Sequence, residues 1–290
     1  MKNNHFFLVL LIMFMYGSAY PIGKIATNIV PPLLMGSLRV LILFIFILPF
    51  FKFRIPRKNF LTLLLFSFTM GFGCYGTLYL SIHLSSFITP IIIGAQLSVP
   101  FGLILSLITL NEKISPTKWI LIFASFIGIL ILSYDPRFVQ ELYGLLTVTL
   151  MAFFYAVSNI LSRFLKEIDT IVQIGWHCIV GFILLILFSF IFEGNPVQYL
   201  LPINYNLILT VIHASLFVSL IGHGGMFYLY KFYPVANVLP FYSLFPIFGI
   251  ALTFLIFHEI PGLYEIIGGV IVISSVFLLH LHDKFAKVLE

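Results

Sequence analysis

Long stretches without charged residues restrict what this chain can fold into more than any other feature. Residues 59–111 contain no Asp, Glu, Lys or Arg, and neither do residues 194–230 or 232–258. A helix that crosses a membrane needs about 20 mostly apolar residues, so the first stretch has room for two such helices and a turn. Charged residues make up 9% of the chain, whereas they make up roughly 25% of a soluble domain. We therefore expect lipid to surround most of the fold.

The apolar runs favour helices over a β-barrel. Backbone groups in lipid need partners within the protein, which leaves helices or closed barrels as spanning structures. Barrel strands alternate apolar and polar residues, whereas residues 6–15 and 41–51 are apolar at nearly every position. The sequence thus predicts an all-α integral membrane protein. A cleavable signal peptide is the alternative for the first run, but the run continues past its small residues, Gly17-Ser18-Ala19.

Ten transmembrane helices can be placed along the chain. They cover about residues 6–26, 32–51, 60–82, 87–109, 118–134, 142–162, 171–192, 207–230, 235–257 and 263–281. The connections are short, and the longest, residues 193–206, contains the helix breakers Pro196 and Pro202. We therefore expect no soluble domain. Cys74 and Cys178 both lie inside apolar runs and predict no disulfide.

The distribution of Lys and Arg predicts the orientation in the membrane. If the N-terminus is cytoplasmic, twelve of the 15 basic residues fall in cytoplasmic loops and tails, and the outer loops hold Arg137 alone. The other two, Lys24 and Arg39, lie within spans. We expect a multi-pass protein of the cell inner membrane with both termini in the cytoplasm.

The two halves of the chain share an ordered set of landmarks. Tyr16 is followed eight residues later by Lys24, and Tyr155 is followed eight residues later by Arg163. The other matched landmarks are Gly71-Phe72-Gly73 with Gly222-His223-Gly224, and Pro100 before Glu112 with Pro246 before Glu259. Ordered Gly, Pro and polar landmarks are harder to obtain by chance than general apolar similarity. They predict two five-helix repeats, residues 1–137 and 138–290.

Loop charges predict that the second repeat is inverted. Five spans are an odd number, so the second copy should enter the membrane upside down. The turn at Glu112 carries Lys113 and Lys118 and is expected in the cytoplasm, whereas the equivalent turn at Glu259 has no basic residue and is expected outside. The predicted fold is therefore ten transmembrane helices arranged as two inverted five-helix repeats.

These landmarks resemble those of the EamA family of the drug/metabolite transporter superfamily, over essentially the whole chain. The features concerned are Tyr16 with Lys24, Pro31-Pro32-Leu33 with Arg39, and the two Pro-to-Glu helix ends. Residues 30–35, 158–160 and 240–246 are similar to the O-acetylserine/cysteine exporter branch. The resemblance implies ten helices, a central cavity between the halves, and export of amino acids or related metabolites.

The chain also departs from that family's pattern. Tyr16 and Tyr155 stand where a tryptophan is usual, and Leu121 stands where the first copy would carry a glycine. His223 replaces an aromatic residue typical of the exporter branch. These departures bear on the substrate and leave the expected fold unchanged.

Transporters with inverted repeats bind near the middle of the membrane, between the halves and beside broken helices. A proline has no amide hydrogen, so the carbonyl four residues earlier loses its helical partner. The prolines concerned are Pro21, Pro100 and Pro246, and the carbonyls belong to Gly17, Gln96 and Tyr242. These carbonyls and the Gln96 amide suit a ligand ammonium group. A kink satisfied by a neighbouring helix is the alternative.

Polar and aromatic side chains within the spans are the candidates for binding a substrate. They are Tyr16, Ser18, Arg39, Tyr75, Tyr79, Gln96, Asn159, His177, His223, Tyr228, Tyr242 and Ser243. Arg39 should face protein or water, where it could bind a substrate carboxylate or a helix-end carbonyl. Lys24 and Arg163 could gate the two mouths of a cavity, or reach the membrane surface as snorkelling side chains.

Motifs of other protein classes are missing from the sequence. The chain has no Walker A motif, and His258-Glu259-Ile260-Pro261-Gly262 does not fit the HExxH zinc motif. The aspartates lie in loops or the tail. We therefore expect no catalytic residue, no cofactor and no metal site. The net charge of +5 reflects loop lysines and arginines, so nucleic acid is not an expected partner.

The sequence thus favours a secondary transporter that moves a small metabolite, an amino acid or derivative, across the inner membrane by alternating access, with export favoured. Uptake of a metabolite and a non-transporting membrane ligand receptor are the alternatives. Because no Asp or Glu lies deep inside a span, proton coupling would have to use His177 or His223, and facilitated diffusion or exchange is equally open. The expected partners are a small-molecule substrate and the lipid bilayer, with the protein a monomer or homodimer.

Overall fold

The computed structural model describes residues 3–53, 59–110, 115–132, 141–233 and 238–289, and these residues form helices and connections without strands. The first half contains α1 (Asn3–Thr27), α2 (Pro32–Ile47), η1 (Leu48–Phe50), α3 (Phe60–Ser67), η3 (Phe68–Cys74), α4 (Tyr75–Leu84), α5 (Thr89–Gly94), η4 (Ala95–Leu97), α6 (Ser98–Leu110) and α7 (Pro116–Leu132). The second half contains α8 (Leu142–Phe164), α9 (Thr170–Phe192), α10 (Val197–Leu200), α11 (Tyr205–Ile212), η6 (His213–Gly224), α12 (Gly225–Phe232), η7 (Leu239–Leu244), α14 (Phe245–Phe257) and α15 (Leu263–Leu289). The prediction of an all-helical protein is confirmed for this part of the chain.

Helices long and apolar enough to cross a membrane account for seven of the ten predicted spans. They are His5–Thr27, Pro32–Phe50, Phe60–Leu84, Thr89–Thr109, Leu142–Phe164, Thr170–Phe192 and Tyr205–Phe232. The other three predicted spans fall on shorter apolar helices, Trp119–Ile131, Phe245–Phe257 and Leu263–Ser275. Large apolar side chains such as Phe50 and Leu130 point outward, as expected for a surface covered by lipid. The chain is a multi-pass membrane protein.

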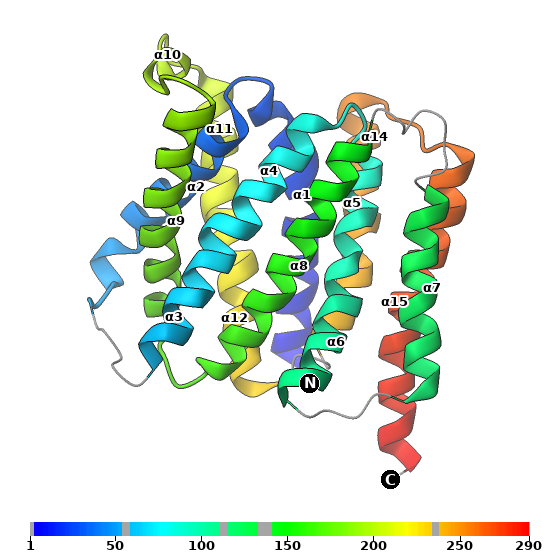
Figure 1. Cartoon of the computed structure of the whole chain (residues 1–290). Coiled ribbons are helices and arrows are strands. Elements are labelled where there is room, and N and C mark those ends of the chain that lie inside the picture. Colours follow the sequence, from blue (N-terminus) through cyan, green and yellow to red (C-terminus); the bar gives the residue numbers. More distant parts are fainter. Residues whose placement is uncertain (1–2, 54–58, 111–114, 133–140, 234–237, 290) are drawn as a thin grey trace.

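Helices of the two halves are interleaved in one bundle (Figure 1). α2 packs against α9, α1 against α14, and α8 against both α4 and α6, whereas α7 and α15 form a pair at one side of the bundle. The N-terminal end of α1 and the C-terminal end of α15 lie at the same end of the bundle, the lower end in Figure 1. We call the opposite end, where α10 lies, the upper end.

Glycines allow the closest helix contacts between the halves. A Cβ atom added at Gly17 in α1 would lie 2.7 Å from the backbone nitrogen of Gly249 in α14. Gly71 in η3 packs in the same way against Gly181 in α9, where a Cβ added at Gly181 would lie 2.8 Å from the Gly71 carbonyl oxygen. Because the obstructing atoms belong to the backbone, a side chain at these positions would force the helices apart.

Both halves contain π-helical turns at their Gly-X-Gly motifs. η3 includes Gly71 and Gly73, and η6 includes Gly222 and Gly224. π-helical turns are rare and occur frequently at functional sites, because the extra residue changes the direction in which side chains point. The side chains next to these turns are therefore candidates for a functional site.

Short 3₁₀ turns precede two of the prolines in the spans. η4 lies before Pro100, and η7 lies before Pro246, whereas α1 continues through Pro21 without a break. A 3₁₀ turn closes its hydrogen bonds over three residues, so it replaces bonds that a following proline removes. The predicted breaks are therefore present in the spans with Pro100 and Pro246 and absent at Pro21.

Candidate functional site

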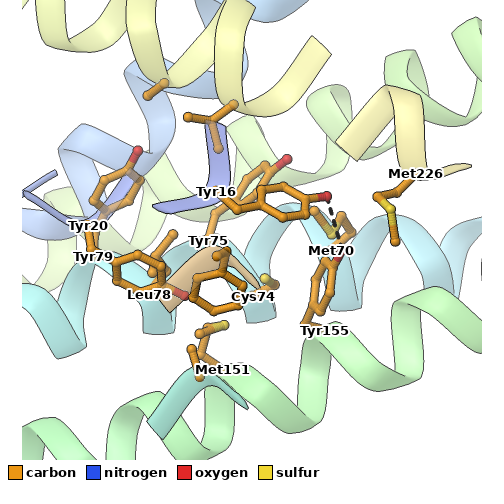
Figure 2. Close-up of a cluster of buried hydrophobic side chains, with 14 of the residues drawn as sticks. Tyr16, Tyr20, Met70, Cys74, Tyr75, Leu78, Tyr79, Met151, Tyr155 and Met226 are labelled. Carbon is orange, nitrogen blue, oxygen red and sulfur yellow. Dashed lines mark hydrogen bonds between the residues drawn. The ribbon is translucent and has the colours of Figure 1, made fainter. Parts of the chain in front are cut away.

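Four side chains from α1, α8, η6 and η7 meet in the centre of the bundle. The Tyr16 hydroxyl lies 3.1 Å from the Tyr155 hydroxyl and 2.9 Å from Nδ1 of His223. The ring of Tyr242 is centred 5.4 Å from that of Tyr16 and 5.5 Å from that of Tyr155. All four side chains are buried. We call these residues the central aromatic cluster; Figure 2 shows the Tyr16 hydroxyl directed at Tyr155.

The π-helical turn η6 brings the cluster together. Gly222 has no side chain, and a Cβ atom there would lie 2.9 Å from Cε1 of Tyr16. The Tyr16 ring therefore lies against the backbone of η6, close enough for its hydroxyl to reach His223 on the next residue. The glycine that the sequence places before His223 thus has a steric role, because it makes room for Tyr16.

A cavity of about 40 Å³ lies at the cluster. Its walls are formed by Tyr16, Ala19, Tyr20, Cys74, Leu78, Ala95, Ser98, Met151, Tyr155, Val218, His223, Tyr242 and Phe245. A single water molecule needs about 10–15 Å³ of such space, so the cavity has room for a few water molecules and is too small for an amino acid. A ligand of that size requires the surrounding helices to move apart.

Arg39 lies beside this cavity, on α2. Its Nε donates to the Ser219 hydroxyl at 2.7 Å, and Nη1 donates to the Tyr79 hydroxyl at 3.3 Å. The guanidinium carbon lies 4.0 Å from the centre of the Tyr75 ring, which is the geometry of a cation–π contact. Nη2 has no hydrogen-bond partner, and the residue is 0% exposed. A permanent charge is therefore fully buried in the membrane-spanning region.

The Tyr75 ring connects Arg39 to the two buried histidines. Its centre lies 5.6 Å from the His223 ring and 5.8 Å from the His177 ring. Hydrogen bonds, ring contacts and the cation–π contact join eight of the predicted substrate-binding residues into one continuous buried group. They are Tyr16, Arg39, Tyr75, Tyr79, Gln96, His177, His223 and Tyr242.

Gln96 joins the group in a way that the sequence did not indicate. Its amide nitrogen donates to the Tyr242 carbonyl oxygen at 2.7 Å, while its Oε1 has no partner. The Tyr242 carbonyl that Pro246 was predicted to free for a ligand is therefore occupied by a side chain of η4. The alternative, a break satisfied by a neighbouring helix, is correct at this position.

Four predicted substrate-binding residues lie outside the group. Ser18 donates to the Met15 carbonyl and lies 3.0 Å from Nε2 of His213. Asn159 is buried, and neither polar atom of its amide has a partner. Tyr228 is 41% exposed and packs near His5, where the N-terminal end of α1 lies. The side chain of Ser243 falls outside the described part of the structure.

The predicted gating residues both bind carbonyl groups at helix ends. Lys24 Nζ donates to the carbonyl oxygens of Ile82 at 3.2 Å and Ser85 at 2.5 Å, where α4 ends. Arg163 Nη1 donates to the Tyr230 carbonyl oxygen at 2.5 Å, in the last turn of α12. A cation is favourable there because the C-terminal end of a helix carries partial negative charge.

Two carboxylates bind the same connection as Lys24. Both oxygens of Glu141 accept from the Ser86 amide, at 2.8 and 3.0 Å. Glu259 accepts from the amides of Ile88 at 2.9 Å and Thr89 at 2.8 Å. We call residues 85–89 the upper connection. Lys24 comes from the same half of the chain as this segment, whereas both carboxylates come from the other half, so charged groups of both halves bind this connection.

A second, larger groove of about 860 Å³ lies between the upper parts of α2, α4, α8 and α9. Phe72, Phe154 and Phe188 are among its apolar walls, and Glu193 and His83 are among its polar residues. The Glu193 carboxylate is already bound by backbone amides at the start of α2. None of the predicted site residues lines this groove, so the central cavity is the better candidate site.

The structure adds residues that the sequence-based prediction omitted. Tyr155, Tyr20 and Cys74 line the cavity, and Ser219 binds Arg39. Tyr155 could have been included, because it is the counterpart of Tyr16 in the repeat. Nothing in the sequence singles out Ser219. It lies one turn before His223 in η6, and only the contact with α2 shows its importance.

The described residues were also compared with the side-chain groups that metal ions need. No group of three or more His, Cys, Asp or Glu side chains within them could hold a metal ion. Cys74 and Cys178 are both free and buried. The turn at Glu112, which was predicted to match that at Glu259, lies outside the described residues. The described site consists of aromatic rings, hydroxyls, amides and one buried cation, which suits binding of a small organic molecule.

Comparison with known proteins identifies the family of this chain. The model of the EamA-like transporter family matches the chain twice, over residues 4–134 and 142–281. A protein of Salmonella typhimurium described as a "Probable amino-acid metabolite efflux pump" is 23% identical over 288 residues, covering 96% of this chain and 95% of the relative. The uncharacterized transporter YoaV of Bacillus subtilis is 27% identical over 65% of this chain and 67% of its own length.

Two further proteins are similar to this chain. A transporter of Acidianus ambivalens is 30% identical over 199 residues, covering 67% of this chain and 71% of the relative. A solved crystal structure has a TM-score of 0.69 at 14% identity and covers 99% of this chain and 100% of that one, which shows a shared fold. With a family match over both halves, a multi-pass helical bundle and a buried site between helices, the chain belongs to the EamA-like transporter family.

Proposed function

We propose that this transporter moves a small metabolite, an amino acid or derivative, out of the cell across the inner membrane by alternating access. The observation that carries the proposal is the closed central aromatic cluster, where Tyr16 of the first half binds Tyr155 and His223 of the second. A site that both halves complete can be opened by moving one half against the other. The efflux pump of S. typhimurium, similar over almost the whole chain, supports an amino-acid substrate and export.

The proposed architecture is ten transmembrane helices in two inverted repeats, residues 1–137 and 138–290. Paired features of the two halves support it. Lys24 binds the end of α4, and Arg163, its counterpart, binds the last turn of α12. π-helical turns occur in both halves at the Gly-X-Gly motifs, and the family model matches once in each half. The excess of basic residues supports cytoplasmic termini.

The gates are proposed to be charged contacts at helix ends. At the upper end, Lys24, Glu141 and Glu259 hold the upper connection. Opening toward this side requires Glu141 and Glu259 to leave amides of the other half, while the central site stays between the halves. At the opposite end of α8, the contact of Arg163 with Tyr230 would have the corresponding role.

Flux through the purified full-length protein in liposomes tests the proposal. Vesicles loaded with radiolabelled O-acetyl-L-serine or with individual L-amino acids should release them faster than protein-free vesicles, and outside label should exchange with unlabelled substrate inside. Gly222→Leu, whose side chain would occupy the space of the Tyr16 ring, should abolish flux while the protein still elutes as a single species. Binding of these compounds without release or exchange would indicate a receptor and would refute transport.

Reporter fusions test the proposed topology separately. Fusions at both termini should report the cytoplasm, and a reporter inserted at the Glu259 turn should report the outside. Termini on opposite sides of the membrane would refute the arrangement of ten spans in two inverted repeats.

A further inference from the structure

Arg39 is a fully buried cation without a carboxylate partner among the described residues. Its contacts are the neutral hydroxyls of Ser219 and Tyr79 and the face of the Tyr75 ring. Four described carboxylates near the ends of the bundle bind backbone amides far from Arg39. Glu141, Glu193 and Glu259 bind backbone amides at the upper end, and Asp169 binds the first turn of α9.

Burial of a charged side chain in a membrane is unfavourable in free energy unless an anion neutralises the charge. A buried charge loses its hydration, and neutral hydroxyls and an aromatic face restore only part of that loss. Charged residues within membrane spans accordingly tend to mark substrate pathways. The unpartnered Nη2 of Arg39 leaves both of its N–H donors available. A guanidinium presents paired N–H donors that match the two oxygens of a carboxylate, which an ammonium group does not.

The position of Arg39 relative to the cavity favours a transported ligand over a fixed ion pair. Cys74 and Leu78 line the cavity, and Tyr75, between them on the same helix, covers the guanidinium. Tyr75 is also the first residue after the π-helical turn η3. A shift of that turn would move the Tyr75 ring away from the guanidinium and toward or out of the region of the cavity.

We propose that Arg39 is the carboxylate subsite of this transporter, and that its substrates are metabolites with a free carboxylate. This inference rests on the proposed transport function and specifies its substrate class. The carboxylate binds the Nη atoms of Arg39 once the Tyr75 ring moves, and the rest of the molecule occupies the cavity beside the central aromatic cluster. Ser219 and Tyr79 hold the guanidinium in orientation, so they are positioning residues.

Ligand-induced thermal stabilisation of the full-length protein in nanodiscs tests the carboxylate subsite. The probes are O-acetyl-L-serine and the twenty protein amino acids, each compared with its methyl ester, which keeps the amine and side chain but removes the negative charge. At least one free acid should stabilise the wild-type protein, and its ester should not. Arg39→Gln should lower the affinity for that acid about tenfold or more, as expected for a lost charge-assisted contact, and should leave the ester unchanged.

Two further variants keep the test decisive if Arg39→Gln does not fold. Arg39→Lys retains the positive charge without the paired N–H donors and should bind the acid with intermediate affinity. Ser219→Ala removes a positioning residue, leaves Arg39 charged and should weaken binding of the acid. Lys166→Gln is the matched control, since it removes an exposed basic residue outside the proposed site and gates and should keep full preference for the acid. Equal stabilisation by acids and esters, or none by any free acid, would overturn the inference. If esters or amines are transported as well as acids, the proposed transport function is supported and the carboxylate subsite is refuted.

Discussion

Replacing Glu259 by alanine should loosen the upper connection selectively. The carboxylate accepts from the amides of Ile88 and Thr89 at 2.9 and 2.8 Å, at the start of α5. Hydrogen bonds to charged groups contribute about 1.5–3 kcal/mol each when buried, but this side chain is partly exposed, so water replaces part of the loss. The cost of removing a helix N-terminal cap, about 0.5–2 kcal/mol, is the better guide.

A loss of about 1.4 kcal/mol corresponds to a tenfold change in an equilibrium. Hydrogen exchange in nanodiscs, read by mass spectrometry on peptides that cover residues 84–94, should therefore be about tenfold faster in Glu259→Ala at the amides of Ile88 and Thr89. Glu193→Ala is the matched control. Its carboxylate binds the amides of Leu33 and Leu34 at 2.7 and 3.0 Å, so it should accelerate exchange there and not in residues 84–94. Unchanged exchange at residues 88 and 89 in Glu259→Ala would refute the reasoning.

The glycine contacts and the aromatic cluster give two further predictions. Gly71→Ala places a Cβ atom against a backbone carbonyl of α9 and should lower the free energy of unfolding by about 1–3 kcal/mol, whereas Gly224→Ala meets the flexible end of an isoleucine side chain and should lower it less. Thermal unfolding in detergent ranks the two variants, and equal losses of stability would contradict the packing argument. Tyr16→Phe removes the partner of both Tyr155 and His223, whereas Tyr155→Phe leaves the contact of Tyr16 with His223 intact. The first variant should therefore lower the unfolding temperature more, and the reverse order would show that the hydroxyl pair does not stabilise the site.

The membrane helices themselves were largely predictable from the sequence. The span placed at residues 142–162 is α8 (Leu142–Phe164), and the span at 171–192 is α9 (Thr170–Phe192). Apolar runs of sufficient length, ended by charged or helix-breaking residues, mark such helices directly. The π-helical and 3₁₀ turns inside the spans were not predictable, because their hydrogen bonds depend on contacts between helices.

Which face of a helix turns inward was harder to predict. Phe227 is 1% exposed, whereas its neighbour Tyr228 is 41% exposed. Amphipathic helices reveal their buried face by their polar side, but helices in lipid are apolar all round, so this signal is weak. The prediction therefore grouped Tyr228 with the central tyrosines although it lies at the surface. Tyr75 and Tyr79, which are four residues apart and share a face, both contact Arg39.

The roles of Lys24 and Arg163 depended on partners in other helices. Their equivalent places, eight residues after Tyr16 and Tyr155, were visible in the sequence. The carbonyl groups that they bind were not, because the end of α4 reaches Lys24, and the end of α12 reaches Arg163, only in the folded bundle. Sequence reasoning could place these charges near the mouths of a cavity and could not identify the helix ends that they hold.

Because Lys24 and Arg163 hold opposite ends of the bundle, the two should have opposite effects on access to the centre. Cys74 lines the cavity and Cys178 does not, so a Cys178→Ser background leaves one native thiol as the reporter. Lys24→Gln removes the cation that binds Ile82 and Ser85, so it should favour opening of the upper end. A membrane-impermeant thiol reagent should then label Cys74 faster from that side alone.

Arg163→Gln removes the cation that binds the Tyr230 carbonyl, so it should have the opposite effect on access. Labelling of Cys74 should then be faster from the side on which α1 begins. Right-side-out and inside-out vesicles separate the two directions of access. The reasoning requires that each variant open one end and leave the other closed, because in alternating access the contacts at one end must form as those at the other break. If both variants increased labelling from the same side, or if neither changed it, these cations would stabilise helix ends without controlling access to the central site.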